Sequence, residues 1–337
     1  MPNYNRRWNA WGTADSPYLT ALSEGGRQAL GLLVGEASPL QDASLEDVLA
    51  TVPESRLADH ALVSTDAEDR LRHARGQSLP DWMDLRSGNI DVFPDGVAFP
   101  NSSAEVRELL DWAQKHDIDV IPYGGGTSVV GHINPQNSAR PVLTVDMGAM
   151  NQLLAFDAES QLATFGAGTP GPALEQALNA RGYTLGHFPQ SWELSTVGGW
   201  VASRSSGQQS LRYGRIEQMF AGGRIETLQG TMEIPTIPAS SAGPDLREIF
   251  MGTEGRMGIL TEVQVRVTPL PEKESFHVAF LPNWETGVTT LRTLAQNKVQ
   301  LSMLRLSNLM ETITMLYSSS DTEATAALND SMSAAGL

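Results

Sequence analysis

A run of three consecutive glycines, Gly124-Gly125-Gly126, follows a short apolar stretch that ends in Pro122-Tyr123. Glycine has no Cβ, so three in succession let the backbone turn sharply and expose neighbouring N–H groups. Such a cluster of amides forms a concavity that binds phosphate or pyrophosphate. A glycine-rich turn without any ligand would explain these residues alone equally well. The run therefore predicts a tight turn directly after a strand, with an anion as the candidate ligand.

Two common phosphate motifs do not match this stretch. The dinucleotide pattern G-x-G-x-x-G requires a glycine at position 129, where Val129 stands. A P-loop would require a lysine after Gly131, and His132 follows instead. Asp146 lies about twenty residues past the glycines, like the ribose-binding acid of a dinucleotide fold. Because the third glycine is missing, we interpret Asp146 as a residue at the end of a strand.

The composition limits the class of protein. The chain has 337 residues, a length that suits about two domains. Its residues are 41% hydrophobic and 18% charged, which is typical of a globular protein. The net charge of −16 argues against a nucleic-acid partner, because few cations remain to neutralise phosphates. The absence of cysteine excludes disulfides and thiolate metal sites. No transmembrane segment and no secretory pattern are visible in the sequence, so the cytoplasm is the default expectation.

The first half of the chain divides near residue 90. Residues 1–90 are expected to form an irregular and helical extension, with a helix over 66–73 and a loop over 79–83. A compact domain over 91–270 follows. It begins with a strand at 97–99, a helix opened by the capping box Ser102-x-x-Glu105, and a strand at 119–123 that delivers the glycines. This β-α-β unit places the glycine turn at the end of a strand, where ligands bind in layered folds.

Further strands, helices and turns are expected from periodicity and from the positions of proline and glycine. Strands are expected at 142–147, 162–165 and 260–268, a helix at 172–180, and a hairpin from 224–228 and 231–234. The prolines near Pro271 mark a domain boundary. The segment 271–337 is expected to begin a second α+β domain, with strands at 277–281 and 301–306 around a helix at 283–298.

Three other stretches share the small and polar character of the glycine run. They are 190–200, 203–207 and 252–260, and each combines glycine with hydroxyl or charged residues. A single phosphate needs only one such loop. Several amide-rich loops from distant segments suit a long cofactor that has a pyrophosphate and a ring system.

Together these stretches resemble flavoproteins of the vanillyl-alcohol oxidase and p-cresol methylhydroxylase superfamily, and within it the alkyldihydroxyacetonephosphate synthase family. The resemblance runs nearly end to end. It is carried by Trp8–Gly12, Glu68-Asp69-Arg70, Ala74-Arg75-Gly76, Pro122–Ser128, Gly186-His187, Glu193–Trp200, Ala242–Asp245 and Met251–Glu262. Each motif is weak alone, but their order and spacing are specific.

The resemblance implies an α+β fold: a two-subdomain FAD-binding domain of the p-cresol methylhydroxylase type over 91–270, followed by part of an α+β cap domain. The cofactor-binding residues it implies are Pro122, Tyr123, Gly124, Gly125, Gly126, Thr127, Ser128, Gln190, Ser191, Trp192, Glu193, Leu194, Ser195, Thr196, Ser203, Arg204, Ser205, Ser206, Glu254, Gly255, Arg256, Met257, Gly258, Ile259 and Leu260. Many superfamily members carry a flavin-bonded histidine directly after the glycines. Thr127 stands there, so we expect non-covalent FAD.

The activity that the resemblance implies is exchange of an acyl for an alkyl group on acyl-dihydroxyacetone phosphate, a step in ether lipid synthesis. An FAD-linked oxidase or dehydrogenase of a 2-hydroxy acid such as D-lactate or glycolate is the alternative, and a non-catalytic FAD-binding fragment is the third. The family's catalytic tyrosine and histidines are expected beyond Leu337, so the chain resembles a truncated product, with Leu301, Met303 and Leu304 partly uncovered. A small-molecule substrate is expected, and a homodimer stays open.

Several residues have simpler explanations than ligand binding. Arg204 and Arg256 suit either the site or a surface ion pair. His187, Trp192 and Trp200 are interpreted mainly as packing residues. His132 and His277 lack neighbouring metal ligands, so no metal is expected. Residues 238–241 are a departure from the synthase family, which has an arginine in this region.

Overall fold

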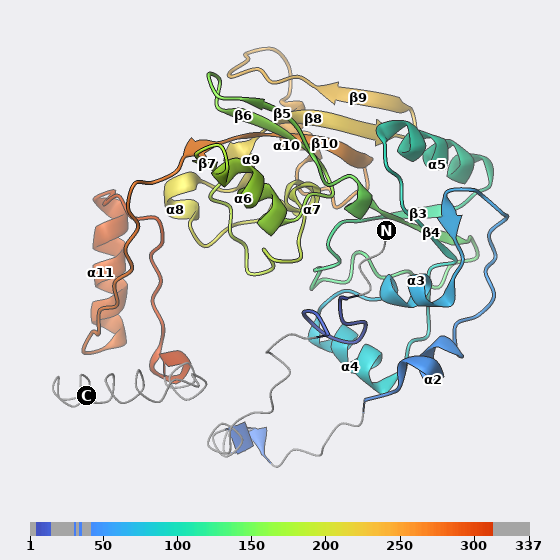
Figure 1. Cartoon of the computed structure of the whole chain (residues 1–337). Helices are drawn as coiled ribbons and strands as arrows, with labels where there is room; N and C mark the ends of the chain where they lie inside the picture. Colours follow the sequence, from blue (N-terminus) through green and yellow to red (C-terminus); the bar gives the residue numbers. More distant parts are fainter. Residues whose placement is uncertain (1–4, 15–29, 32–33, 36–41, 313–337) are drawn as a thin grey trace. The chain divides into compact units, whose positions relative to one another are not determined.

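The computed structural model describes residues 5–14, 30–31, 34–35 and 42–312 (Figure 1). The chain divides into two compact units, Met1–Ala14 with Leu40–Pro271, and Asp15–Pro39 with Glu272–Leu337. The first unit contains both large sheets and the cavity described below. Within the described residues, no helix is long and apolar enough to cross a bilayer.

The N-terminal part of the first unit contains α2 (Leu45–Leu49), α3 (Ala67–Arg72) and α4 (Leu79–Ser87). Helix α3 lies where the sequence predicted it. The expected loop at 79–83 is wrong, because these residues form the first part of α4. Ser78 and Asp81 form a reciprocal capping box, and Pro80 occupies the first turn, where its missing N–H costs nothing.

A four-stranded sheet holds the glycine turn. Its order is β1 (Val63–Ser64), β2 (Gly96–Ala98), β4 (Val142–Asp146) and β3 (Asp119–Tyr123), with β4 parallel to both of its neighbours. Helix α5 (Ser103–Lys115) connects β2 to β3, and β4 later fills the gap between them. The predicted β-α-β unit is therefore confirmed. The glycine run starts at residue 124, directly after the carboxyl end of β3.

Helix α5 buries the stripe that its spacing predicted, Val106, Leu109, Leu110 and Ala113. It contacts β3 of the first sheet and β8 and β10 of the second, so it packs between the two sheets (Figure 1). Only half of the predicted capping box forms. Ser102 accepts from the amide of Glu105, but the Glu105 carboxylate accepts from the amide of Asn101, one residue earlier than the motif requires.

A five-stranded antiparallel sheet forms the second layer. Its order is β5 (Leu153–Asp157), β6 (Leu162–Gly166), β10 (Ile259–Arg266), β8 (Phe220–Thr227) and β9 (Gly230–Ile234). The hairpin of β8 and β9 and the alternating burial of β10 follow the sequence pattern. The sequence reasoning missed β5, because this edge strand is largely exposed and its residues do not alternate.

Short helices cover one face of this sheet: α6 (Gly171–Asn179), α7 (Val197–Ser203), α8 (Ser210–Tyr213), α9 (Ile216–Met219) and α10 (Leu246–Phe250). Helices α7 and α9 contact β10 (Figure 1). The 3-10 turn η2 (Met147–Ala149) follows β4, and β7 (Tyr183–Thr184) pairs with β11 (Thr268–Pro269). Phe165, Trp200 and Phe220 are among the largest side chains in the core beneath this sheet.

In the second unit, α11 (Trp284–Gln296) forms where a helix was expected, capped by Asn283. The expected strands at 277–281 and 301–306 are wrong. A strand needs a paired edge, and no described residue of 272–312 supplies one. Val278 is instead 84% exposed. Leu301, Met303 and Leu304 are partly exposed. The sequence also predicts a helical tail after Asn308, and most of that segment lies outside the described residues.

Candidate functional site

A cavity of about 350 Å³ opens in the first unit where three segments meet. One wall is the loop after β3, and the second is the segment that leads into and follows α7. The third wall is the turn between α10 and β10. The volume lies within the range of about 300–1,000 Å³ that is typical of small-molecule sites.

Most of the predicted cofactor-binding residues meet at this cavity. Those that line it are Pro122, Tyr123, Gly124, Gly125, Gly126, Thr127, Ser128, Ser191, Ser195, Thr196, Ser203, Ser205, Glu254, Gly255, Gly258, Ile259 and Leu260. They come from four separate stretches of sequence, and the fold brings all four to one place.

The other predicted residues lie beside the cavity without lining it: Gln190, Trp192, Glu193, Leu194, Arg204, Ser206, Arg256 and Met257. The guanidinium of Arg204 forms an ion pair with Glu248 at 2.5 Å. Arg256 donates to the carbonyl of Thr253 at 3.1 Å and is exposed. Both arginine side chains therefore have protein partners in this structure.

The three glycines allow two walls of the cavity to touch. A methyl group on Gly125 would overlap the carbonyl oxygen of Leu194, and one on Gly124 would lie 2.5 Å from Thr196 Oγ1. Gly126 has φ +62°, a left-handed conformation that other residues adopt at a cost. The glycine run is therefore required by close backbone packing as well as by any ligand.

The same loop offers backbone amides to a ligand. No described residue accepts a hydrogen bond from the amides of Gly125, Gly126 or Thr127, although all three residues line the cavity. Backbone N–H groups seldom lack an acceptor unless water or a ligand takes the place of one. Successive N–H groups on a turn form an anion-binding concavity. The loop therefore fits a phosphate or pyrophosphate group.

The second wall presents hydroxyl groups at fixed positions. Thr196 caps α7 by accepting from the amide of Gly199, and Ser195 accepts from the buried indole of Trp200 at 2.7 Å. Gly198 packs directly on Ala167, which also lines the cavity. These contacts hold the start of α7 against the second sheet, so its side chains line the cavity in a defined arrangement.

Ser205 and His187 form a pair at the edge of this wall. Ser205 lines the cavity, and its hydroxyl lies 2.7 Å from Nε2 of His187, which is only 1% exposed. Burial lowers the pKa of His187 from 6.5 to about 4, so the ring is neutral at pH 7. Its Nδ1 is buried and has no hydrogen-bond partner in the described part of the chain. His187 is thus a neutral packing residue that holds one hydroxyl of the cavity.

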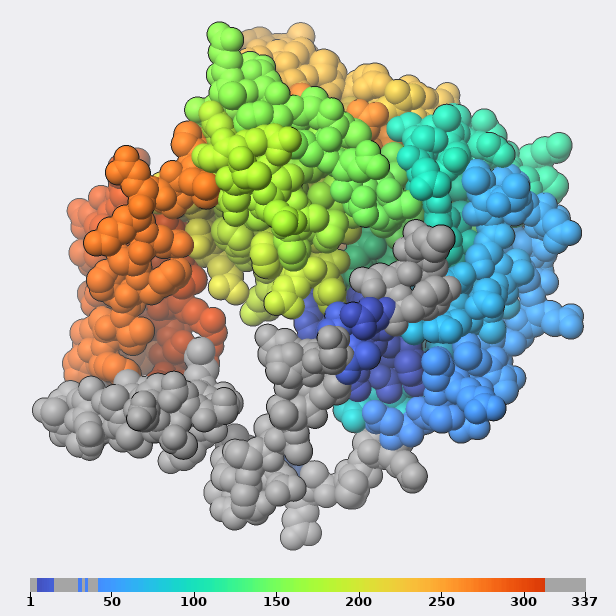
Figure 2. All heavy atoms as spheres, viewed as in Figure 1, coloured from blue at the N-terminus to red at the C-terminus, as the bar shows by residue number. Residues whose placement is uncertain are grey.

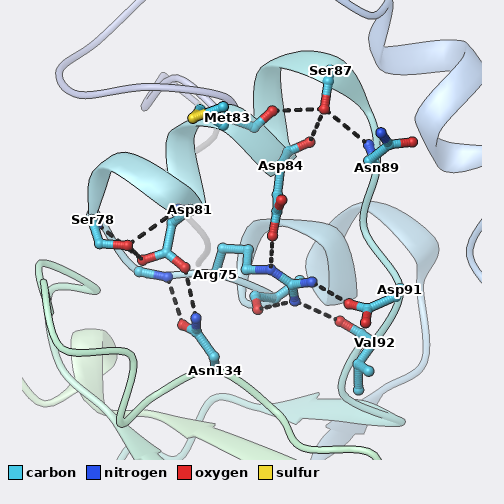
Figure 3. Close-up of polar contacts among 12 residues, drawn as sticks. Arg75, Ser78, Asp81, Met83, Asp84, Ser87, Asn89, Asp91, Val92 and Asn134 are labelled. Carbon is cyan, nitrogen blue, oxygen red and sulfur yellow. Dashed lines mark hydrogen bonds and ion pairs between the residues drawn. The ribbon is translucent and has the colours of Figure 1, made fainter.

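The far end of the glycine loop is held by the segment that leads into α4. The amide of Gln77 donates to the carbonyl of Ser128 at 2.6 Å, and the amide of Gly76 donates to Asn134. Asn134 in turn donates to Asp81 at 2.7 Å, and Asp81 belongs to the capping box of α4 (Figure 3). The cap of α4 therefore also fixes the loop that ends the cavity wall.

Arg75 stabilises the same segment from the buried side. Its guanidinium pairs with Asp84 at 3.2 Å and Asp91 at 2.6 Å, and it donates to the carbonyl of Val92 (Figure 3). The Ala74-Arg75-Gly76 motif of the sequence is therefore a support for the glycine loop. The sequence carried this motif, but only the structure shows what it contacts.

The near end of the loop rests on Tyr123 and its buried neighbours. The Tyr123 ring is packed 4.5 Å from the ring of His73, and burial raises the pKa of its hydroxyl. Nε2 of His73 lies 2.9 Å from Asp146 at the end of β4, and Asp146 also accepts from the amide of Gly148. Asp146 is therefore a strand-end residue, as the sequence indicated.

The cavity also includes residues that the sequence reasoning did not assign. They are Val129, Val130, His132, Ile133, Met147, Ala167, Gly198, Gly199, Trp200, Ala202, Phe250 and Thr253. Several continue a predicted stretch by one or two positions, and that continuity was a usable signal. Met147 and Ala167 follow ordinary strands and carry no such signal.

Comparison with known proteins identifies the class to which this site belongs. The FAD binding domain family matches residues 94–234, which include the glycine loop and α7. This part of the chain is therefore similar to the FAD-binding domains of flavoproteins, and its α+β fold is shared with the solved structure described next.

Individual relatives are named more specifically than the family model. The chain is 32% identical over 334 residues to alkyldihydroxyacetonephosphate synthase of Caenorhabditis elegans, covering 89% of this chain and 55% of that protein. It is 36% identical to the uncharacterized FAD-linked oxidoreductase YgcU of Escherichia coli strain K12, over 74% of this chain and 50% of that protein. A solved structure of alkyldihydroxyacetonephosphate synthase superposes with a TM-score of 0.85 at 27% identity, covering 98% of this chain and 67% of that one.

These relatives confirm the resemblance read from the sequence. Proteins named glycolate oxidase and D-lactate dehydrogenase are more distant relatives of the chain. The chain spans about half the length of the two curated relatives described above, 55% and 50%.

Proposed function

We propose that the cavity binds FAD without a covalent bond, with the pyrophosphate on the loop of residues 124–128. The observation that carries this is the set of cavity-lining amides at Gly125, Gly126 and Thr127, which no described residue uses. FAD supplies redox and adduct-forming chemistry when bound. The hydroxyl wall, with Ser195, Thr196 and Ser205, is suited to donate hydrogen bonds along the remainder of the cofactor.

The absence of a covalent bond follows from Thr127. A threonine hydroxyl does not form the bond to flavin that a histidine forms at the corresponding position of many superfamily members. The imidazole of His132 also lines the cavity. Its Nδ1 lies 3.1 Å from Oγ of Ser128 and 3.8 Å from Oε2 of Glu254. His132 is therefore the residue to examine if a covalent flavin is found.

The cofactor proposal is tested on the chain itself by adding FAD and following flavin fluorescence and absorbance. We expect saturable binding, and we expect all of the flavin in the supernatant after acid precipitation. Flavin retained in the precipitate would contradict the non-covalent proposal, and peptide mapping would then compare His132 with Thr127. Absence of any binding would contradict the proposed site.

We propose further that this FAD domain serves an alkyldihydroxyacetonephosphate synthase-like transferase. Support comes from the relatives of that name, which align over most of this chain. In the proposed reaction a fatty alcohol replaces the acyl group of acyl-dihydroxyacetone phosphate, and the acyl group leaves as a fatty acid. No net oxidation or reduction occurs. A 2-hydroxy acid dehydrogenase is the rival function, supported by the more distant relatives.

The two functions give different results with the FAD-loaded chain. Exchange of a radiolabelled fatty alcohol into acyl-dihydroxyacetone phosphate, with the flavin still oxidised, supports the transferase. Bleaching of the flavin by D-lactate or glycolate supports the dehydrogenase and contradicts the transferase. If the loaded chain does neither, it is a binding fragment.

A further inference from the structure

The N-terminal residues 5–14 form a small turn that contacts the glycine loop through Arg6. Its backbone closes on itself, because the amide of Arg7 donates to the carbonyl of Gly12 and the amide of Ala14 donates to that of Asn5. Trp8 packs on the buried cluster around α3 and α4. Figure 2 shows these dark-blue residues against the lighter blue residues of the same unit. We call residues 5–14 the N-terminal strap.

Arg6 joins the strap to the glycine loop. Its Nη1 donates to the carbonyl oxygen of Gly125 at 2.5 Å. Its own carbonyl accepts from Nη1 of Arg72, in α3, at 2.7 Å. The backbone of Arg6 is therefore held by α3, and its guanidinium reaches the glycine loop.

The charge of Arg6 is incompletely paired. Nη2 is buried and has no hydrogen-bond partner among the described residues, and no described carboxylate forms an ion pair with Arg6. A buried guanidinium nitrogen without an acceptor is costly, because the protein does not replace the hydrogen bond that water would make. An anion held on the loop would offset part of that cost.

Peptide geometry connects Arg6 to the cavity. Gly125 and Gly126 line the cavity, whereas Arg6 contacts the loop without lining it. The peptide bonds of the described chain are trans, and the C=O and N–H of one trans peptide point to opposite sides. When Arg6 holds the carbonyl of Gly125, the amide of Gly126 points away from Arg6, and Gly126 itself lines the cavity.

We propose that Arg6 is a positioning residue of the cofactor site. It orients the Gly125–Gly126 peptide so that the Gly126 amide faces a phosphate, and its charge attracts that phosphate through the thin glycine loop. This rests on the proposed placement of the FAD pyrophosphate at residues 124–128. The ligand chemistry that Arg6 favours is therefore a pyrophosphate, as in FAD or ADP, and a flavin without phosphate gains nothing from it.

The test compares Arg6→Ala with Arg7→Ala in titrations with FAD, ADP and riboflavin. Arg7 is the neighbouring cation of the strap, and among the described residues no hydrogen bond or ion pair joins its side chain to the loop. We expect Arg6→Ala to weaken FAD and ADP about tenfold and to leave riboflavin within about twofold of the parent chain. Arg6→Lys keeps a donor and a charge and should restore most of the FAD affinity.

Two outcomes would overturn the role of Arg6. In the first, Arg6→Ala binds FAD as tightly as Arg7→Ala does. In the second, Arg6→Ala loses affinity equally for FAD and riboflavin, which indicates a structural effect only. If Arg6→Ala does not fold, Arg6→Lys and Arg6→Gln are compared, since both can donate to Gly125 and only one is charged. The lysine variant should bind FAD at least about threefold more tightly, and equal binding contradicts the proposal. Failure of the parent chain to bind FAD would instead refute the proposed site, because Arg6 is unchanged there.

Discussion

The glycine wall and the hydroxyl wall of the cavity are built in different ways. The glycine wall, residues 124–128, presents backbone, and its shape depends on close contacts with Leu194, Thr196 and Tyr123. The hydroxyl wall, residues 191–205, presents side chains that are held individually by helix caps and by His187. A substitution in the glycine wall therefore disturbs the whole loop, whereas one in the hydroxyl wall removes a single contact.

The largest effect is expected for Gly125→Ala. The new methyl would overlap the Leu194 carbonyl and lie 2.8 Å from the Cα of Ser195, both backbone atoms that cannot rotate away. We expect a loss of more than about 3 kcal/mol in the free energy of unfolding, by denaturant titration, and loss of FAD binding. Gly199→Ala is the matched control, because its methyl meets only the Thr196 hydroxyl at 3.2 Å and lies inside α7. Its stability should change by less than about 1 kcal/mol, and equal effects would contradict the contrast between the walls.

The pH dependence of stability tests the hydroxyl wall. The pKa of His187 is lowered from 6.5 to about 4 by burial, so between these pH values the unfolded chain binds a proton that the folded chain does not. Stability should therefore fall as the pH drops from about 6.5 to about 4, by on the order of 3 kcal/mol in total. His187→Gln should remove this part of the pH dependence. Parallel curves for the two proteins between pH 4 and 7 would show that His187 titrates normally.

A smaller effect is expected where α4 supports the glycine wall. Asn134→Ala leaves the amide of Gly76 without its acceptor and removes the donor to Oδ1 of Asp81. We expect about 2 kcal/mol of destabilisation and weaker FAD binding, since the end of the loop loses its hold. Gln136→Ala, at an exposed position two residues on, is the control and should change stability by less than about 0.5 kcal/mol. Unchanged FAD affinity in a destabilised Asn134→Ala would mean that the loop does not depend on α4.

The same contrast explains which parts were predictable from sequence. Local sequence patterns predicted the glycine turn, α3, α5, α6 and the β8–β9 hairpin, because hydrophobic periodicity and helix caps depend on only a few neighbouring residues. The supports of the glycine wall were not predictable, since Arg6 is 119 residues from Gly125 and Gly76 is 58 residues from Asn134, and these pairs meet only in the folded chain. The strands expected at 277–281 and 301–306 failed for the same reason. An apolar pattern indicates a strand, but a strand forms only where a paired edge is present.

The smallest effect is expected for Ser205→Ala, which removes one hydroxyl from the cavity. Nε2 of the buried His187 then loses its bond of 2.7 Å, and Nδ1 already has no partner among the described residues. We expect about 1 kcal/mol of destabilisation and a shift of the bound flavin absorbance, with FAD affinity lowered by about threefold. Ser206→Ala changes an exposed neighbouring hydroxyl and should alter stability by less than about 0.5 kcal/mol. If Ser205→Ala instead abolished FAD binding, as Gly125→Ala should, the hydroxyl wall would also act as one unit, and the distinction between the two walls would fail.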